Sequence, residues 1–167
     1  RQERMNLLFV VCGEGLGHAS RCLHLGHYIQ QQGHAVHFAA YGKSYDFIDQ
    51  HGCSNLHHTP REVCLEGEDG FFSLKKTLWC SRWIVLDMIR SVIAIRRIIL
   101  DHAIDCVVCD TMYGGVLAAR YTGVPVVFIT NQNHFNGVGG TTNPVWRLLN
   151  FLVRRYIRLA CAVIVPD

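Results

Sequence analysis

The sequence predicts one α/β domain with a doubly wound, mostly parallel six-stranded Rossmann-like sheet and helices on both of its faces. Short apolar runs alternate with longer stretches of helical periodicity, which is typical of repeated βαβ units. Half of the residues are hydrophobic and 17% are charged, a composition that excludes a disordered chain. A length of 167 residues suffices for one hydrophobic core and argues against two.

Six short apolar runs are predicted as strands. They span residues 6–11, 35–40, 55–59, 105–110, 126–130 and 162–165. Three helices are predicted to end before a glycine, the usual C-terminal signal. They span residues 18–32, 44–51 and 113–122. An acidic loop at residues 60–72 leads into a further helical stretch that ends near residue 102. Asn143 followed by Pro144 opens a last helix that ends near residue 160.

The formal net charge is only +3, but the charged residues are distributed unevenly. Residues 111–166 contain five arginines and no acidic residue, so this part is expected to present a positive face suited to phosphates or anionic lipid. Arg147, Arg154 and Arg158 form one stripe of the last predicted helix. The stripe favours either peripheral contact with a membrane or a core-packing helix with solvated arginines. A nucleic-acid partner is not expected.

The compartment is predicted from what the chain contains. No stretch of about 18 apolar residues is free of charge, so a transmembrane helix is not expected. The apolar run at residues 7–12 is too short for the core of a signal peptide. Eight cysteines are spread through a chain large enough to fold without disulfides, which favours a reducing compartment. We therefore expect a cytoplasmic protein, with the inner face of the membrane as a peripheral docking surface.

Metal-ligand patterns are weak. Cys106 and Cys109 resemble a C-x-x-C pair, but residues i and i+3 of a strand point to opposite faces of the sheet. The paired histidines lack further ligands at metal-binding spacing and are expected to be scattered side chains. They are His24 and His27 in a predicted helix and His57 and His58 in a predicted strand. No metal site is predicted.

The loop after the first predicted strand is rich in glycine. Gly13, Glu14, Gly15 and Gly17 lie beyond the carboxyl end of the strand, where parallel α/β sheets bind ligands. Glycines let backbone N–H groups approach an anion at a helix N-terminus, so these four residues are candidates for substrate binding. The G-x-G-x-G spacing is one residue short of the dinucleotide fingerprint, and the second strand ends without an acidic residue, which disfavours NAD. A purely structural turn is the alternative interpretation.

His18 opens the first predicted helix and is the candidate general base. A helix N-terminus disfavours imidazolium and so keeps the ring neutral, as a base requires. Asp110 ends the fourth strand and is the candidate partner that orients the ring. Arg21 shares the helix face of His18 and is expected to hold a phosphate or carboxylate, with Ser20 as a further substrate contact. The alternatives are an incidental helix-opening histidine and an aspartate that only caps the next helix.

Three polar residues follow the fifth predicted strand. Asn131, Gln132 and Asn133 carry amides that can hydrogen-bond sugar hydroxyls, which makes them candidates for substrate binding. The alternative is that these residues form a turn, for which asparagine is favoured.

Four features together carry a family resemblance. They are the strand–GEGLGH–helix opening, Asp110 at a strand end, Gly123-Val124-Pro125 before the next strand and Asn131-Gln132 after it. The set resembles the N-terminal half of glycosyltransferases with the B-type two-domain fold. It is most similar to family 28 and its archaeal relatives, which include the peptidoglycan N-acetylglucosaminyltransferase. The resemblance covers residues 5–167 and implies an N-terminal acceptor-binding domain, with the donor-binding C-terminal domain absent from this chain.

The resemblance also implies residue roles. Gly13, Gly15, Gly17 and His18 match the family's glycine-rich loop and its histidine, and Gln132 and Asn133 match a glutamine-asparagine pair. Asp110 stands where related plant-type enzymes keep the aspartate paired with the base. Glu14 departs from the neutral loop of the peptidoglycan enzyme and would repel a diphosphate unless Arg21 or the helix end compensates. The length of the chain is the second departure from the family pattern, because the chain ends where a linker to the donor-binding domain is expected.

The expected function is that of a glycosyltransferase half. The resemblance implies that a sugar is transferred, with inversion and without a metal, from a nucleotide-diphosphate sugar to a sugar or lipid-linked acceptor. The nucleotide-diphosphate sugar is a co-substrate, and no other cofactor is expected. His18 would remove the acceptor proton while Asp110 holds the ring, and the fragment alone is expected to be inactive. One alternative is a non-catalytic, membrane-facing acceptor-binding subunit of a split two-chain transferase. Another is a nucleotide-sugar epimerase of similar architecture.

Overall fold

The computed structural model describes residues 3–62, 67–68, 71–72, 84–130, 147, 151 and 154–165. Within these ranges, six strands form one sheet in the order β3-β2-β1-β6-β7-β8, and every pairing is parallel. The strands are β1 (Asn6–Val11), β2 (Ala35–Ala40), β3 (Leu56–His58), β6 (Cys106–Asp110), β7 (Val126–Ile129) and β8 (Ala162–Ile164). The predicted α/β class and parallel sheet are confirmed.

Strand order reverses at the centre of the sheet. The chain starts in β1, moves outward through β2 to β3, and then crosses back to β6 on the other side of β1. Where the connections that follow two adjacent strands run in opposite directions, a crevice forms between their loops, and ligands of such sheets bind there. The loops after β1 and β6 therefore flank the expected binding position.

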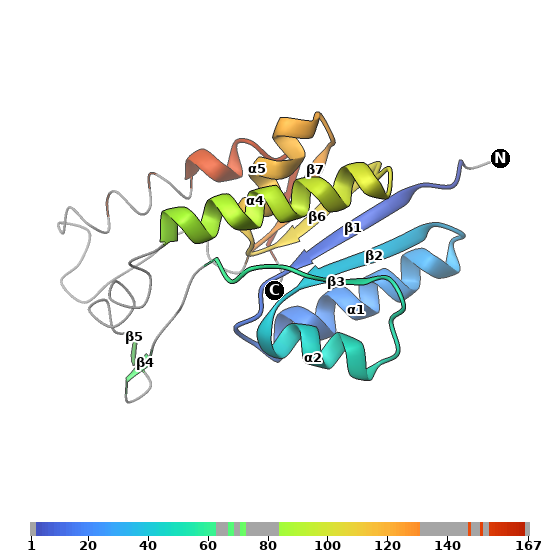
Figure 1. Ribbon diagram of the computed structural model, residues 1–167, viewed down its shortest axis with the longest axis horizontal. Helices are drawn as coiled ribbons and strands as arrows, with labels where there is room; N and C mark the ends of the chain where they lie inside the picture. Colours follow the sequence, from blue (N-terminus) through green and yellow to red (C-terminus); the bar gives the residue numbers. More distant parts are fainter. Residues whose placement is uncertain are drawn as a thin grey trace.

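Helices cover both faces of the sheet (Figure 1). The helices α1 (Leu16–Gln31) and α2 (Gly42–Gln50) lie on one face, and α4 (Ile84–Asp101) and α5 (Tyr113–Thr122) lie on the other. Alternate residues of β1 feed the two resulting cores, because successive side chains of a strand point to opposite faces. Phe9 packs with Cys22 of α1, and Leu8 packs with Ile95 of α4. Burial on both faces explains why these strands are almost wholly apolar.

Most element boundaries differ from the predicted ones by one or two residues. The helix α1 begins at Leu16 because Gly15 serves as its N-cap in extended conformation, whereas the prediction began it at residue 18. The acidic loop at residues 60–72 contains a short antiparallel pair, β4 (Gly67–Glu68) with β5 (Phe71–Phe72), that was predicted as loop. Two-residue strands are too short to leave an alternating pattern in the sequence.

The last predicted helix is described in part. Residues 147, 151 and 154–157 are helical, and Arg147, Arg154 and Arg158 are exposed. Asn131, Gln132 and Asn133 lie outside the described residues. None of the described helices combines the length and the apolar character needed to cross a membrane.

Candidate active site

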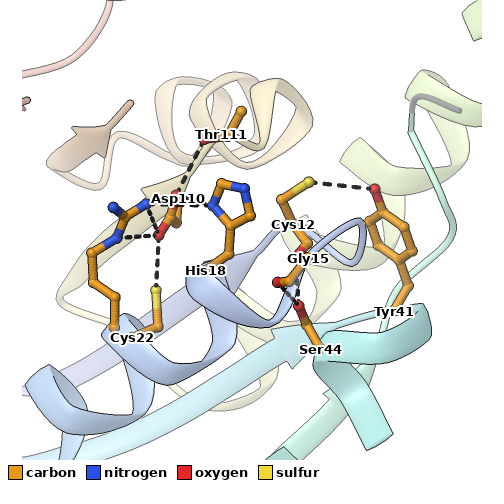
Figure 2. A network of polar contacts seen from close by, with 9 residues as sticks. Cys12, Gly15, His18, Cys22, Tyr41, Ser44, Asp110 and Thr111 are labelled. Carbon is orange, nitrogen blue, oxygen red and sulfur yellow. Dashed lines mark hydrogen bonds and ion pairs between the residues drawn. The ribbon is translucent and has the colours of Figure 1, made fainter. Parts of the chain in front are cut away.

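The glycine-rich loop after β1 is held by the start of α2. Gly13 lies so close to Tyr41 that an added Cβ would collide with the backbone oxygen and the ring of that residue. Ser44, which is fully buried, donates its hydroxyl to the Cys12 backbone oxygen at 2.6 Å and to the Gly15 backbone oxygen at 3.3 Å (Figure 2). The loop therefore has a defined shape up to the first turn of α1.

The sheet brings the first turn of α1 next to the end of β6. Val11 at the end of β1 pairs with Asp110 in the neighbouring parallel strand, so the two strands end at the same edge. His18 lies in the first turn of α1, directly after the loop that leaves β1. Its Nδ1 donates to Asp110 Oδ1 at 2.8 Å. The structure thus brings the predicted base and its predicted carboxylate partner into contact.

Asp110 is fully buried and is bonded on both carboxylate oxygens. Arg21 Nε donates to Oδ2 at 2.9 Å and Arg21 Nη2 donates to Oδ1 at 2.8 Å, a bidentate arrangement. Cys22 Sγ and Thr111 Oγ1 also donate to this carboxylate, at 3.4 Å and 3.2 Å. Burial alone would raise the pKa of Asp110, but hydrogen bonds and positive charge from His18 and Arg21 outweigh burial and hold it below its ordinary value.

The imidazole of His18 is partly accessible. Its side chain keeps 22% of its surface exposed, whereas that of Asp110 keeps none. Figure 2 shows Nδ1 facing Asp110 and the opposite ring nitrogen turned away from it. With its proton on Nδ1, the ring carries its lone pair on Nε2. This arrangement can accept a proton at Nε2 while the buried carboxylate stabilises the imidazolium that forms.

The contacts of Arg21 and Glu14 differ from those expected from the sequence. Arg21 does hold a carboxylate, but it is that of Asp110. Glu14 accepts two bonds from Arg61, at 2.8 Å and 2.9 Å, and a third from Tyr41 at 3.3 Å. The charge of Glu14 is therefore compensated by Arg61 rather than by Arg21. The two residues are 47 positions apart, so no local pattern in the sequence indicates the pair.

Three further predicted binding residues lie in the loop after β1 and at the start of α1. Gly15 is the N-cap of α1, and Gly17 lies exposed in its first turn. Ser20 lies on α1 between His18 and Arg21, and its backbone oxygen accepts from His24 Nδ1 at 2.7 Å. These positions agree with a loop beside the His18 contact, and their roles in binding stay predictions.

Glu62 was missed by sequence reasoning, which placed it in an acidic loop. The structure buries it to 4% exposure, where it accepts from Ser91 Oγ at 2.6 Å and, through both oxygens, from the Gly114 backbone N–H at 3.1 Å. Gly114 lies in the first turn of α5, whose N-cap residue Met112 makes no side-chain cap. Glu62 therefore caps α5 from a distant segment. Burial raises its pKa, although hydrogen bonds from Ser91 and the backbone act in the opposite direction.

The expectation of scattered histidines is wrong for His57. Its ring lies against those of His37 and His102, and one nitrogen of each ring lies within 4.8 Å of the others. Sequence spacing did not reveal the group, because strand pairing and the end of α4 bring these residues together. Cys106 and Cys109, by contrast, are free, and neither belongs to the described group of three histidines.

Comparison with solved structures supports the fold. The all-parallel Rossmann-like fold of this chain is shared with solved glycosyltransferases. MurG of Acinetobacter baumannii superposes with a TM-score of 0.63 at 16% identity, over 96% of this chain and 40% of that one. The Streptomyces glycosyltransferase SsfS6 gives 0.61 at 16% identity, over 98% and 48%. A Listeria monocytogenes protein described as a UDP-N-acetylglucosamine 2-epimerase gives 0.62 at 12% identity, over 99% and 40%.

The family is shown by sequence. The chain belongs to the family described as glycosyl transferase family 1, whose model matches residues 5–161. An uncharacterized glycosyltransferase of Methanosarcina mazei is 34% identical over 171 residues, which cover 98% of this chain and 43% of the relative. A second, from Methanosarcina acetivorans, is 34% identical over 172 residues, which cover 98% and 42%. The chain thus spans less than half the length of these relatives.

Proposed function

We propose that the protein carrying this chain transfers a sugar from a nucleotide-diphosphate sugar to an acceptor hydroxyl with inversion and without a metal, and that this domain binds the acceptor. The observation that carries the proposal is the contact between His18 and the buried carboxylate of Asp110, in a domain that belongs to a glycosyltransferase family. Such a pair, at the carboxyl ends of the strands of a parallel sheet, supplies a proton acceptor where ligands of this fold bind.

His18 is the general base in this mechanism. As the acceptor oxygen attacks the anomeric carbon, its proton moves to His18 Nε2, and the bond from that carbon to the diphosphate oxygen breaks with its electron pair on the leaving group. A single displacement of this kind inverts the configuration of the anomeric carbon. Asp110 fixes the ring through Nδ1 and stabilises the imidazolium as it forms.

Arg21 acts through Asp110. Its bidentate contact keeps the carboxylate ionised and fixes both oxygens, so that Oδ1 stays directed at His18. Acceptor contacts are proposed for the loop and the start of α1, and for the amides after β7. These residues are Gly13, Glu14, Gly15, Gly17, Ser20, Asn131, Gln132 and Asn133.

The donor is proposed to bind mainly outside this domain. The relatives are more than twice as long as the segment that they share with this chain, which leaves room for a second domain. The alternative is a non-catalytic acceptor-binding subunit whose donor-binding partner is a separate chain. The coding sequence distinguishes the two, because a donor domain in the same reading frame contradicts the split arrangement.

The test starts by finding the donor with the full-length protein. A panel of nucleotide-sugars is screened by thermal shift, because a ligand that binds only the folded state raises its melting temperature. With the donor that binds, His18→Ala is expected to lower kcat about a hundredfold or more. His27→Ala, which removes an exposed histidine of the same helix, is the matched control and should leave kcat unchanged.

Two results would contradict the proposal. An unchanged kcat in His18→Ala removes the general-base role. Accumulation of an epimerised free sugar nucleotide, without any glycosylated acceptor, would identify an epimerase. The Listeria protein described as an epimerase has a similar fold to this chain.

A further inference from the structure

Three histidines from separate parts of the chain meet on the sheet face covered by α4. His37 lies in β2 two residues before Ala39, so both side chains point to the same face. His57 in β3 pairs with Ala39 in register and shares that face. Ala39 packs in the core that includes Ile95 of α4, and His102 directly follows the last residue of that helix. The topology therefore directs all three imidazoles to one place.

The nitrogens of these rings are close enough to share one ion. His37 Nδ1 lies 3.2 Å from His57 Nε2, and one nitrogen of each of the three rings lies within 4.8 Å of the other two. Zinc–nitrogen bonds of 2.0–2.1 Å in a tetrahedral site place two ligand nitrogens about 3.3 Å apart. The separation of His37 and His57 already matches that value, and the His102 nitrogen, within 4.8 Å of both, supplies the third corner of the tetrahedron.

The chemistry of the group selects the ion. All three ligand atoms are imidazole nitrogens, which favour zinc, copper or nickel over magnesium or calcium. Metal ligation requires neutral imidazole. Burial, together with the neighbouring imidazoles, lowers the pKa of His37 and of His57, which agrees with this requirement.

We propose that His37, His57 and His102 bind one divalent transition-metal ion of the zinc class. The ion joins the paired strands β2 and β3 to the end of α4, which follows β3 only after a long segment of chain. Because α4 and the edge strand approach each other here, the ion stabilises the packing of the helix against the sheet. The fourth coordination position is left to solvent. The site is separate from the His18–Asp110 contact, and the inference does not depend on the proposed transferase activity.

The experiment uses the full-length protein, stripped of metal with a chelator and dialysed. Zn²⁺ is titrated against a chromophoric competitor, with Mg²⁺ as a second titrant, and the melting temperature is recorded with and without each ion. One equivalent of Zn²⁺ is expected to bind and to raise the melting temperature, and Mg²⁺ is expected to do neither. Each of His37→Ala, His57→Ala and His102→Ala is expected to weaken Zn²⁺ binding at least about a hundredfold, since removing a ligand costs more than disturbing an outer-shell partner.

His51→Ala is the matched control. His51 also follows the end of a helix, α2, and is exposed, but it lies outside the three-histidine group. It should bind Zn²⁺ as the unaltered protein does. If His37→Ala or His57→Ala fails to fold, His102→Gln carries the test, because that position lies after the helix and outside the sheet.

Three results would overturn the inference. The first is no stoichiometric Zn²⁺ binding, in which case the rings form only a hydrogen-bonded stack. The second is binding that His102→Gln and His51→Ala leave equally strong. The third comes from Co²⁺ substitution: a thiolate-to-cobalt charge-transfer band would place the ion on cysteines, whereas a site of imidazoles and water gives none.

Discussion

Two buried carboxylates flank the turn between β6 and α5, and the protein holds them in opposite ways. Asp110 at the end of β6 is bonded by the Arg21 guanidinium and by His18. Glu62 is bonded by the Ser91 hydroxyl and a backbone N–H of α5. Both are almost completely inaccessible. The pKa of Asp110 nevertheless lies below its ordinary value, because hydrogen bonds from His18 and Arg21 and the charge of the Arg21 guanidinium outweigh burial, whereas burial raises the pKa of Glu62.

The difference agrees with the chemical role proposed for Asp110 and with a structural role for Glu62. A buried carboxylate keeps its charge where cations contact it, while dipoles alone compensate burial less completely. Asp110 is therefore a fixed negative charge beside an imidazole, which is what a base needs to become protonated. Glu62 satisfies backbone donors at the start of α5, which is the task of a helix cap. Burial alone would not have distinguished them.

The largest expected effect comes from neutralising one of the two carboxylates at a time in the full-length protein. Asp110→Asn keeps the shape of the side chain but removes the charge and one acceptor, so kcat is expected to fall about a hundredfold or more. Glu62→Gln, the matched substitution at the other carboxylate, is expected to change kcat by less than about threefold. Steady-state kinetics with saturating donor measure both values. Equal losses in the two variants would contradict the assignment of different roles.

The sequence predicted those parts of the molecule that depend on local signals. The strands were recognisable because parallel strands buried on both faces are continuous apolar runs, as at residues 6–11. The approach of His18 to Asp110 was predictable because both follow from the order of βαβ units and from strand ends that meet at one edge. Here two local patterns and one topological rule were sufficient.

The rest depends on contacts that no local pattern encodes. Glu62 lies in a stretch with several acidic residues, and only its approach to α5, 52 positions further on, shows that it is a buried cap. Arg61 pairs with Glu14 across 47 positions. His57 joins two imidazoles from β2 and the end of α4. Each of these contacts is set by the packing of distant segments, and a search for ligand spacing along the chain cannot find them.

A smaller effect tests the cap directly. A Cβ added to Gly114 would collide with the carboxylate of Glu62 and lie 3.0 Å from Ser91 Oγ, so Gly114→Ala is expected to destabilise the protein by about 1–3 kcal/mol. Glu62→Ala leaves buried donors unpaired and is expected to cost about 1–3 kcal/mol. Because Glu62→Ala also makes room for the new methyl group, the double variant should lose less than the sum, by about 1 kcal/mol.

Urea unfolding of the four proteins in this double-mutant cycle measures the coupling. Gly17→Ala is the control, because a Cβ there meets nothing within 4 Å and helix propensity favours alanine. It should not lower the free energy of unfolding. Strict additivity of Gly114→Ala and Glu62→Ala would show that the two residues do not share one contact.

The smallest effect is the pH dependence of stability, which should have opposite signs at the two carboxylates. Asp110 has a lowered pKa, so its contribution is fully present above the ordinary carboxyl pKa of about 4 and is lost as the pH falls through its lower folded value. Glu62 has a raised pKa, so its contribution is present below about pH 4 and is lost as the pH rises through its higher folded value.

The two neutral variants make these signs measurable. The loss of unfolding free energy in Asp110→Asn should be largest near neutral pH and shrink as the pH is lowered below about 4. The loss in Glu62→Gln should be largest near pH 4 and shrink as the pH is raised, because glutamine never bears the charge that burial penalises. Urea unfolding at pH values between about 2 and 8 gives both curves. Curves that run parallel would contradict this comparison, since opposite slopes require both the contacts of Arg21 and His18 that lower the pKa of Asp110 and the burial that raises the pKa of Glu62.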